Sequence, residues 1–171
     1  MLLPRGLLVI VFIFAIPCSA EEMPNPQRPP VIPHLPQLAN KSGYIFSGTV
    51  KSVDRITPTS ANSVPVMQIT FQVEHGYAGV HSGRDLVIRE YAGLWQSGER
   101  YHPGQRVMLF LYPPSKLGLT SPVGGARGRY LLDPRGRIII NPPRSPGSSR
   151  SPIKPTLLDP NDFARALRDA R

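Results

Sequence analysis

The residues best suited to binding chemistry are aromatic and basic side chains gathered between positions 89 and 102. They are Arg89, Tyr91, Trp95, Arg100, Tyr101 and His102. Planar rings beside guanidinium groups are the combination that stacks on sugars or on nucleic-acid bases. The alternative is that Trp95 and Tyr101 pack over the domain and hold their loop in place, because a lone tryptophan is usually well buried. The sequence therefore predicts a binding surface or a packed loop at this segment.

Acid–base or metal chemistry has few candidate residues. The only hydrolase hypothesis that the sequence offers rests on Glu74, His75 and His81, which flank a predicted turn. The other candidates for a metal or acid–base site are Glu99 and His102, further along the chain. No G-x-S-x-G, P-loop, H-E-x-x-H or G-x-G-x-x-G motif is present. The glycine-rich stretch 124–128 precedes a predicted strand, whereas a phosphate-binding loop would precede a helix. We therefore expect no catalytic residue, no metal and no cofactor.

The first twenty residues have the order of an export signal. Arg5 is followed by an apolar run over residues 6–16, and the small residues Cys18 and Ala20 precede Glu21. The apolar run is too short for a membrane span, which needs about 20 residues. We expect a cleaved leader, no transmembrane anchor after cleavage, and a periplasmic or extracellular protein. Lipidation of Cys18 is the alternative, which Pro17 disfavours because a small residue is expected there.

Composition limits the chemistry of the remaining chain. Cys18 is the only cysteine of the 171 residues and lies in the leader, so the mature protein has neither a disulfide nor a cysteine zinc site. The 21 prolines exclude a fully helical fold. The net charge of +9 allows contact with anionic lipid, polysaccharide or nucleic acid. Scattered arginines that only keep the protein soluble are the alternative.

Two proline-rich segments border the central part of the chain. Residues 21–40 are predicted to form an extended spacer, and residues 141–155 a linker. A short helix follows, because Asp159 can cap it and Pro160 suits its first position. Phe163 and Leu167 share one face of this helix and are expected to dock it on the domain. The expected layout is a signal peptide (1–20), a spacer (21–40), a β domain (41–140), and a linker with a helix (141–171).

Alternating apolar residues predict five or six strands in the β domain. The segments are 44–51, 66–74, 86–91, 107–112 and the hairpin 130–140. Val53 and Ile56 fall out of register with the first strand, which predicts a bulge near Ser52. The segment 107–112 is apolar on both faces and should be central or covered. The fold class is therefore mainly all-β, a small barrel or sandwich.

Three of these segments carry a family pattern. The runs 44–50, 69–73 and 104–111 resemble the netrin/TIMP-like OB-fold pattern found in secreted bacterial proteins. The resemblance implies a small OB-like closed β-barrel and an interaction role. The family usually has cysteines near the position of residues 92–96, and some members bind a metalloprotease through an N-terminal cysteine. The mature chain has neither, so protease inhibition is not carried over.

The sequence favours an exported, non-enzymatic β-barrel module that binds an unknown protein or envelope component, or that serves as an envelope structural module. One alternative is an anionic-polymer binder, whose ligand is single-stranded nucleic acid or a glycan. Nucleic acid is disfavoured among these partners. The other alternative is the small hydrolase built on Glu74, His75 and His81.

Overall fold

The structure is a computed structural model that describes residues 32–57, 64–96, 100–141 and 155–171. Its elements are α1 (Leu35–Lys41), β1 (Tyr44–Ile56), β2 (Val66–Ala78), β3 (Asp85–Tyr91), the 3₁₀ helix η1 (Ala92–Trp95), β4 (Arg106–Leu111), the 3₁₀ helix η2 (Gly125–Gly128), β5 (Arg129–Leu132), β6 (Ile138–Ile140), β7 (Thr156–Leu158) and α2 (Pro160–Asp169). The expected signal peptide, most of the spacer and most of the linker lie outside the described residues. The prediction of a mainly β fold is confirmed.

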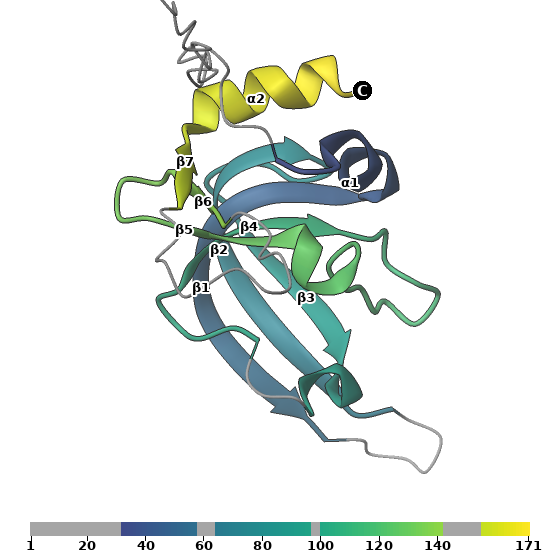
Figure 1. The fold of residues 1–171 in the computed structure, drawn as a ribbon. Helices are drawn as coiled ribbons and strands as arrows, with labels where there is room; N and C mark the ends of the chain where they lie inside the picture. Colours follow the sequence, from purple (N-terminus) through teal and green to yellow (C-terminus); the bar gives the residue numbers. More distant parts are fainter. Residues whose placement is uncertain (1–31, 58–63, 97–99, 142–154) are drawn as a thin grey trace, which may run out of the picture.

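Within the described ranges, one antiparallel sheet runs in the order β3-β2-β1-β4-β5-β6-β7 (Figure 1). The long pair β1 and β2 is bent, and its register shifts at three places, the last between Val50 and Ser52. The predicted bulge near Ser52 is thus confirmed. Gly48 lies at another shift, where a Cβ atom would come within 2.4 Å of the Gln72 carbonyl oxygen. The two backbones can approach this closely only because residue 48 has no side chain.

The sheet has a buried apolar cluster on each face. Phe46, Phe71 and Tyr101 belong to the cluster enclosed by the curved strands. Met108 and Phe110 of β4 belong to the other cluster, together with side chains from both α-helices. Val107, Leu109 and Leu111 point to the first cluster, so β4 is buried on both faces. This arrangement confirms that the strand predicted at 107–112 is central.

The edge strand β3 approaches the chain that follows β4. After Leu111 the chain turns back, and Val123 N donates to Phe110 O at 2.8 Å. In the same returning segment, Thr120 N donates to Arg89 O of β3 at 2.8 Å. This contact joins the two sides of the curved sheet by a backbone hydrogen bond. The hydrogen-bonded strand order itself ends at β3 and β7 within the described residues.

The predicted hairpin is present as β5 and β6. Gly136 has a φ of 81°, a conformation that favours glycine in the turn. The Asp133 carboxylate accepts hydrogen bonds from the backbone N–H groups of Arg135 and Arg137 at 2.9 and 2.8 Å. Local side-chain chemistry therefore fixes this turn, as the sequence indicated.

Two expectations are wrong, one about the proline-rich spacer and one about the number of strands. Residues 35–41 form α1 and are not extended, because Ile32, Leu35 and Leu38 supply a stripe that is buried against the sheet. Pro36 lies in the first turn of α1, where proline is tolerated. Thr156–Leu158 forms β7 on the edge of β6, so the described strands number seven, where five or six were expected.

The terminal helix α2 forms as predicted and lies across the end of the sheet, close to α1 (Figure 1). The Asp159 carboxylate accepts from Asn161 N at 2.9 Å and caps the helix. Phe163 is fully buried, with its ring edge-on to Tyr77 at 4.8 Å, and Leu167 is also buried. The predicted docking through these two residues is confirmed. None of the described helices has the length and apolar character that crossing a membrane would require.

Candidate functional site

A buried carboxylate organises the aromatic and basic segment singled out in the sequence. The alternation of β3 places Glu90 on the same inner face as Leu86 and Ile88. Glu90 is 0% exposed and accepts hydrogen bonds from Trp95 Nε1 at 3.0 Å and from Tyr101 OH at 3.2 Å. Arg100 Nη1 lies 3.4 Å from the same carboxylate. Burial raises the pKa of Glu90, although Arg100 opposes that shift.

Tyr101 belongs to the core. It is 1% exposed, and its ring packs edge-on against Phe71 at 5.5 Å. The Arg129 guanidinium lies 5.5 Å from the centre of the same ring, a cation–π arrangement. The expectation that Tyr101 offers an open stacking surface is wrong, because both the ring and the hydroxyl are occupied. The packing alternative holds for this residue, while Trp95 is half-buried.

The other residues of the predicted cluster face different places. Arg89 is exposed, and its Nε donates to Gln68 Oε1 at 3.4 Å. Tyr91 and Trp95 line a hollow of about 400 Å³ together with Arg55, Pro65 and Met67. Arg100 and His102 line a larger groove. The six residues therefore do not form one binding surface.

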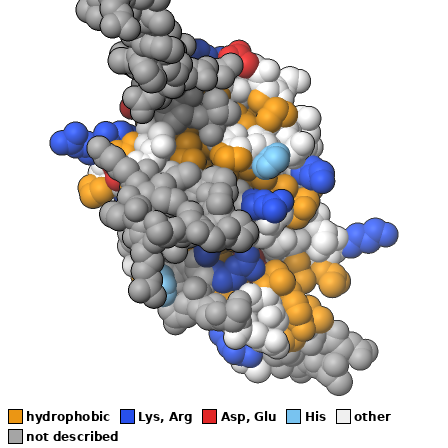
Figure 2. Space-filling model, viewed as in Figure 1, with side chains coloured by type: hydrophobic (Ala, Val, Ile, Leu, Met, Phe, Trp, Pro, Cys, Tyr) orange, Lys and Arg blue, Asp and Glu red, His pale blue; other side chains and the backbone are white. Residues whose placement is uncertain are grey.

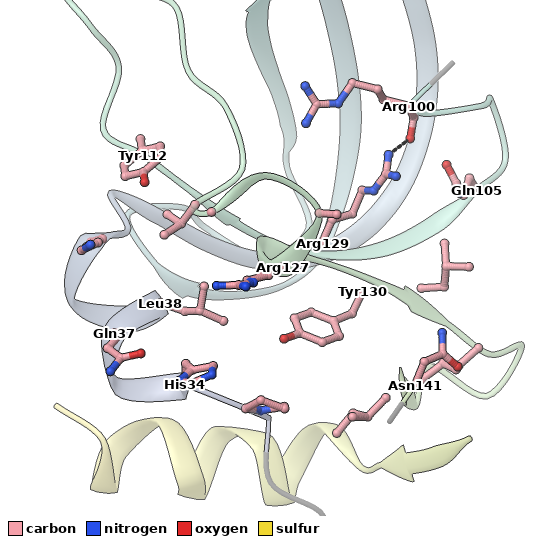
Figure 3. A pocket seen from close by; sticks show the side chains of 18 of the residues that line it. His34, Gln37, Leu38, Arg100, Gln105, Tyr112, Arg127, Arg129, Tyr130 and Asn141 are labelled. Atoms are coloured by element: carbon pink, nitrogen blue, oxygen red, sulfur yellow. Dashed lines mark hydrogen bonds between the residues drawn. The ribbon is translucent and has the colours of Figure 1, made fainter. Parts of the chain in front are cut away.

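The larger groove, of about 980 Å³, is the strongest candidate binding site. Its walls come from α1, the segment before β4, η2, β5 and the end of β6 (Figure 3). Its basic side chains are Lys41, Arg100, Arg127 and Arg129, with His34 and His102. Its amides are Gln37, Gln105 and Asn141. The described lining contains no aspartate or glutamate. We call this site the basic groove.

The basic groove has two kinds of cation. Arg100 and Arg129 are held in place, since Arg100 pairs with Glu90 and Arg129 donates a hydrogen bond to the Arg100 carbonyl. Lys41 and Arg127 are exposed, and neither pairs with a carboxylate of the described residues. On the face seen in Figure 2, blue lysine and arginine side chains lie in several separate places. Cations that line a concave surface without opposing carboxylates create a positive potential that attracts anions.

Local structure explains how the chain presents these cations. Lys41 is the last residue of α1, and Arg129 is the first residue of β5. Arg127 lies in η2, which the chain enters through Gly124 and Gly125, both with a φ of 65°. The glycine-rich stretch is thus a wall of the groove, and the glycines permit the left-handed turn that forms it.

The residues of the hydrolase hypothesis lie elsewhere. Glu74 accepts from Thr49 Oγ1 at 2.7 Å and from the Arg106 guanidinium, and the hydrogen bond from Arg106 holds its pKa below the ordinary value. His75 Nδ1 lies 3.3 Å from Ser47 Oγ, and His81 is exposed. Among the described residues, no three histidine, cysteine, aspartate or glutamate side chains gather as a metal ion would require.

A comparison of the chain with protein-family models, with curated proteins and with solved structures finds no match. The resemblance to the netrin/TIMP-like family therefore stays a prediction from the residues quoted above.

Proposed function

We propose that the protein is an exported, non-enzymatic binding module on an OB-like closed barrel, and that the basic groove binds an anionic ligand. The observation that carries the proposal is the set of four lysine and arginine side chains around a concave surface whose described lining has no carboxylate. Such a surface raises the local concentration of anions and pairs with them directly.

Two features of the fold support the barrel. The Thr120–Arg89 backbone hydrogen bond links the returning segment after β4 to the edge strand β3. The buried ring of Phe71 packs edge-on against both Phe46 and Tyr101, and these rings fill the space that the curved strands enclose. A sheet that curls around its own side chains in this way is typical of small barrels.

The contacts made by two carboxylates, those of Glu74 and Glu90, favour binding over hydrolysis. Glu74 is neutralised by Arg106, and Glu90 is fully buried beneath Trp95 and Tyr101. Neither carboxylate lines the basic groove. The cations and amides that do line it can orient an anion, whereas none of the three residues of the hydrolase hypothesis, Glu74, His75 and His81, lines it.

Binding of inorganic polyphosphate at low ionic strength tests the proposal. Lys41→Glu and Arg127→Glu are expected to weaken binding at least tenfold, because each replaces an exposed cation of the groove by an anion. Arg84→Glu is the matched control, since Arg84 is exposed in the turn before β3 and lies outside the groove. Affinity should also fall as salt is added. The proposal is wrong if the native protein binds neither polyphosphate nor any other polyanion tested at low ionic strength, or if Arg84→Glu weakens binding as much as Arg127→Glu.

A further inference from the structure

The basic groove offers more than charge, and its other side chains indicate which anion it takes. We infer that the ligand is an acidic polysaccharide that carries carboxylates along its chain. This inference rests on the proposed function of the same groove and narrows its ligand class.

The cations are distributed along the groove. Arg127 lies on η2 near its middle, while Arg129 and Arg100 extend toward the side of the central strands (Figure 3). Lys41 adds a further charge from the end of α1. A small anion would use one of these groups, but a chain with a charge on each unit can use Lys41, Arg127 and Arg129 together, while Arg100 stays paired with Glu90. Arginine pairs with a carboxylate through two parallel hydrogen bonds, which suits a uronic acid.

The amides match the hydroxyl groups of a sugar. Gln37 is exposed on α1, and Asn141 is exposed at the end of β6, on the opposite side of the groove (Figure 3). Gln105 accepts from His102 N through Oε1 at 3.2 Å, which leaves the donors of its NH₂ group for a ligand. An amide provides both donors and an acceptor, as a sugar hydroxyl does. A phosphate offers only acceptors, so the amide oxygens would find no partner on it.

Apolar surface lies between the polar groups. Leu131 is 45% exposed, and Tyr130, the preceding residue of β5, also lines the groove. The C–H face of a sugar ring can pack on such side chains while its carboxylate reaches an arginine. The groove therefore combines charged, amide and apolar contacts.

Single-stranded nucleic acid fits the groove less well. Base binding relies on open aromatic faces on which successive bases stack. Trp95 and Tyr101, the residues that the sequence offered for stacking, instead donate to Glu90 and are absent from the groove lining. Of the two tyrosines in the groove lining, Tyr130 packs its ring edge-on against Phe110 and Tyr112 lies apart from it, so successive bases would find no pair of neighbouring open rings (Figure 3).

Binding of three labelled probes by the full chain tests this inference. They are an oligomer of galacturonic acid, a neutral galactose oligomer of equal length, and an oligothymidylate of equal charge. We expect the acidic sugar to bind at least tenfold more tightly than the other two. Gln37→Ala should weaken binding of the acidic sugar about three- to tenfold, the effect of losing one or two hydrogen bonds. It should leave oligothymidylate binding unchanged. Gln72→Ala, an exposed glutamine of β2 outside the groove, is the control.

The possible outcomes test the polysaccharide ligand and the proposed anion binding separately. The polysaccharide inference is overturned if oligothymidylate binds more tightly than the acidic sugar, or if Gln37→Ala lowers the affinity for these two anions equally. Either result leaves the proposed anion binding intact. Equal binding of the neutral and acidic sugars also overturns the inference, because carboxylates would then contribute nothing. If polyphosphate and both acidic probes fail to bind at low salt, the proposed function fails as well. Thermal unfolding of each variant verifies that it folds.

Discussion

Glu90 illustrates how a single buried carboxylate can link the interior to a binding surface. Its oxygens accept from Trp95 and Tyr101, and its charge holds Arg100, which lines the basic groove. Arg129 in turn donates to the Arg100 carbonyl and lies against the Tyr101 ring. Two groove cations are thus positioned through a group that has no contact with solvent.

The ionisation of Glu90 should make stability depend on pH. Because burial raises its pKa above the ordinary 4.5, the folded state binds the proton more tightly than the unfolded state does. The stabilisation is therefore complete below the ordinary value and is lost as pH rises through the folded pKa. Glu90→Gln removes this dependence. The free energy of unfolding of the native protein minus that of Glu90→Gln should fall between pH 4 and pH 7.

Urea unfolding of the two proteins at several pH values checks this prediction. Asp54→Asn is the control, because it removes a carboxylate at an exposed position of β1. A difference between native protein and Glu90→Gln that stays constant from pH 4 to pH 7 would contradict the raised pKa.

Arg106 is expected to be the most important surface-facing arginine for stability. It donates to both Glu74 oxygens and to the carbonyls of Asp133 and Pro134, so it ties β2 and β4 to the hairpin turn. Arg106→Ala should lower the free energy of unfolding by about 1–3 kcal/mol at pH 7, because partly buried acceptors lose a charged donor. Lys51→Ala, which removes the exposed pair with Asp85, should cost at most about 1 kcal/mol.

The effect of Arg106→Ala should also shrink in acid. Arg106 lowers the pKa of Glu74, so the pair stabilises the fold above the ordinary value and this contribution disappears as pH falls through the folded pKa. Urea midpoints at pH 7 and pH 3 provide the measurement. An equal loss at both pH values would show that the contacts with the two carbonyls account for the whole effect.

Among the elements, α2 is expected to contribute more to the stability of the fold than a surface helix of its length usually does. Phe163 is fully buried in the cluster that also holds Leu35, Leu38 and Phe110. Phe163→Ala should lower the free energy of unfolding by about 3–5 kcal/mol, the usual cost of removing a large core side chain. Arg165→Ala, on the exposed face of the same helix, should change it by less than about 0.5 kcal/mol.

Hydrogen exchange provides a second measurement on this helix. Residues 163–169 are expected to be protected as strongly as β1 if the docking is as tight as the burial of Phe163 implies. Fast exchange in α2 beside slow exchange in β1, or a Phe163→Ala variant as stable as the native protein, would contradict the docking.

Most strands were predictable because their burial follows from alternation. The segment 66–74 buries Ile69, Phe71 and Val73 on one face, as its pattern requires. The same rule could have identified Glu90, which shares the inner face of β3 with Leu86 and Ile88. In contrast, α1 was missed because its prolines suggested an extended chain, and β7 was missed because three residues are too few to show a period.

At the scale of the whole molecule, the basic groove could not have been predicted from the sequence. Its cations lie between positions 41 and 129 and are brought together by α1, η2 and β5. The aromatic segment attracted attention because its residues are close in sequence, whereas the groove depends on tertiary contacts. The net charge of +9 indicated anionic partners but carried no information about where they would bind.

The sequence also predicts that the protein is exported. The leader pattern places cleavage between Ala20 and Glu21, which would remove Arg5 and reduce the net charge from +9 to +8. Intact-mass measurement of the protein recovered from the exported fraction should give a chain that begins at Glu21. Recovery of the uncleaved chain in the membrane fraction would contradict this prediction.

The packing of α1 beside α2 has a consequence for when the protein can fold. Residues near both ends of the described chain, Leu35 and Leu167, contribute to the same buried cluster. The cluster thus joins segments far apart in the chain, and it cannot be complete until the ribosome has made and released Leu167. A nascent chain released only as far as β6 lacks the edge strand β7 and the helix α2, whose Leu158 and Phe163 complete this cluster.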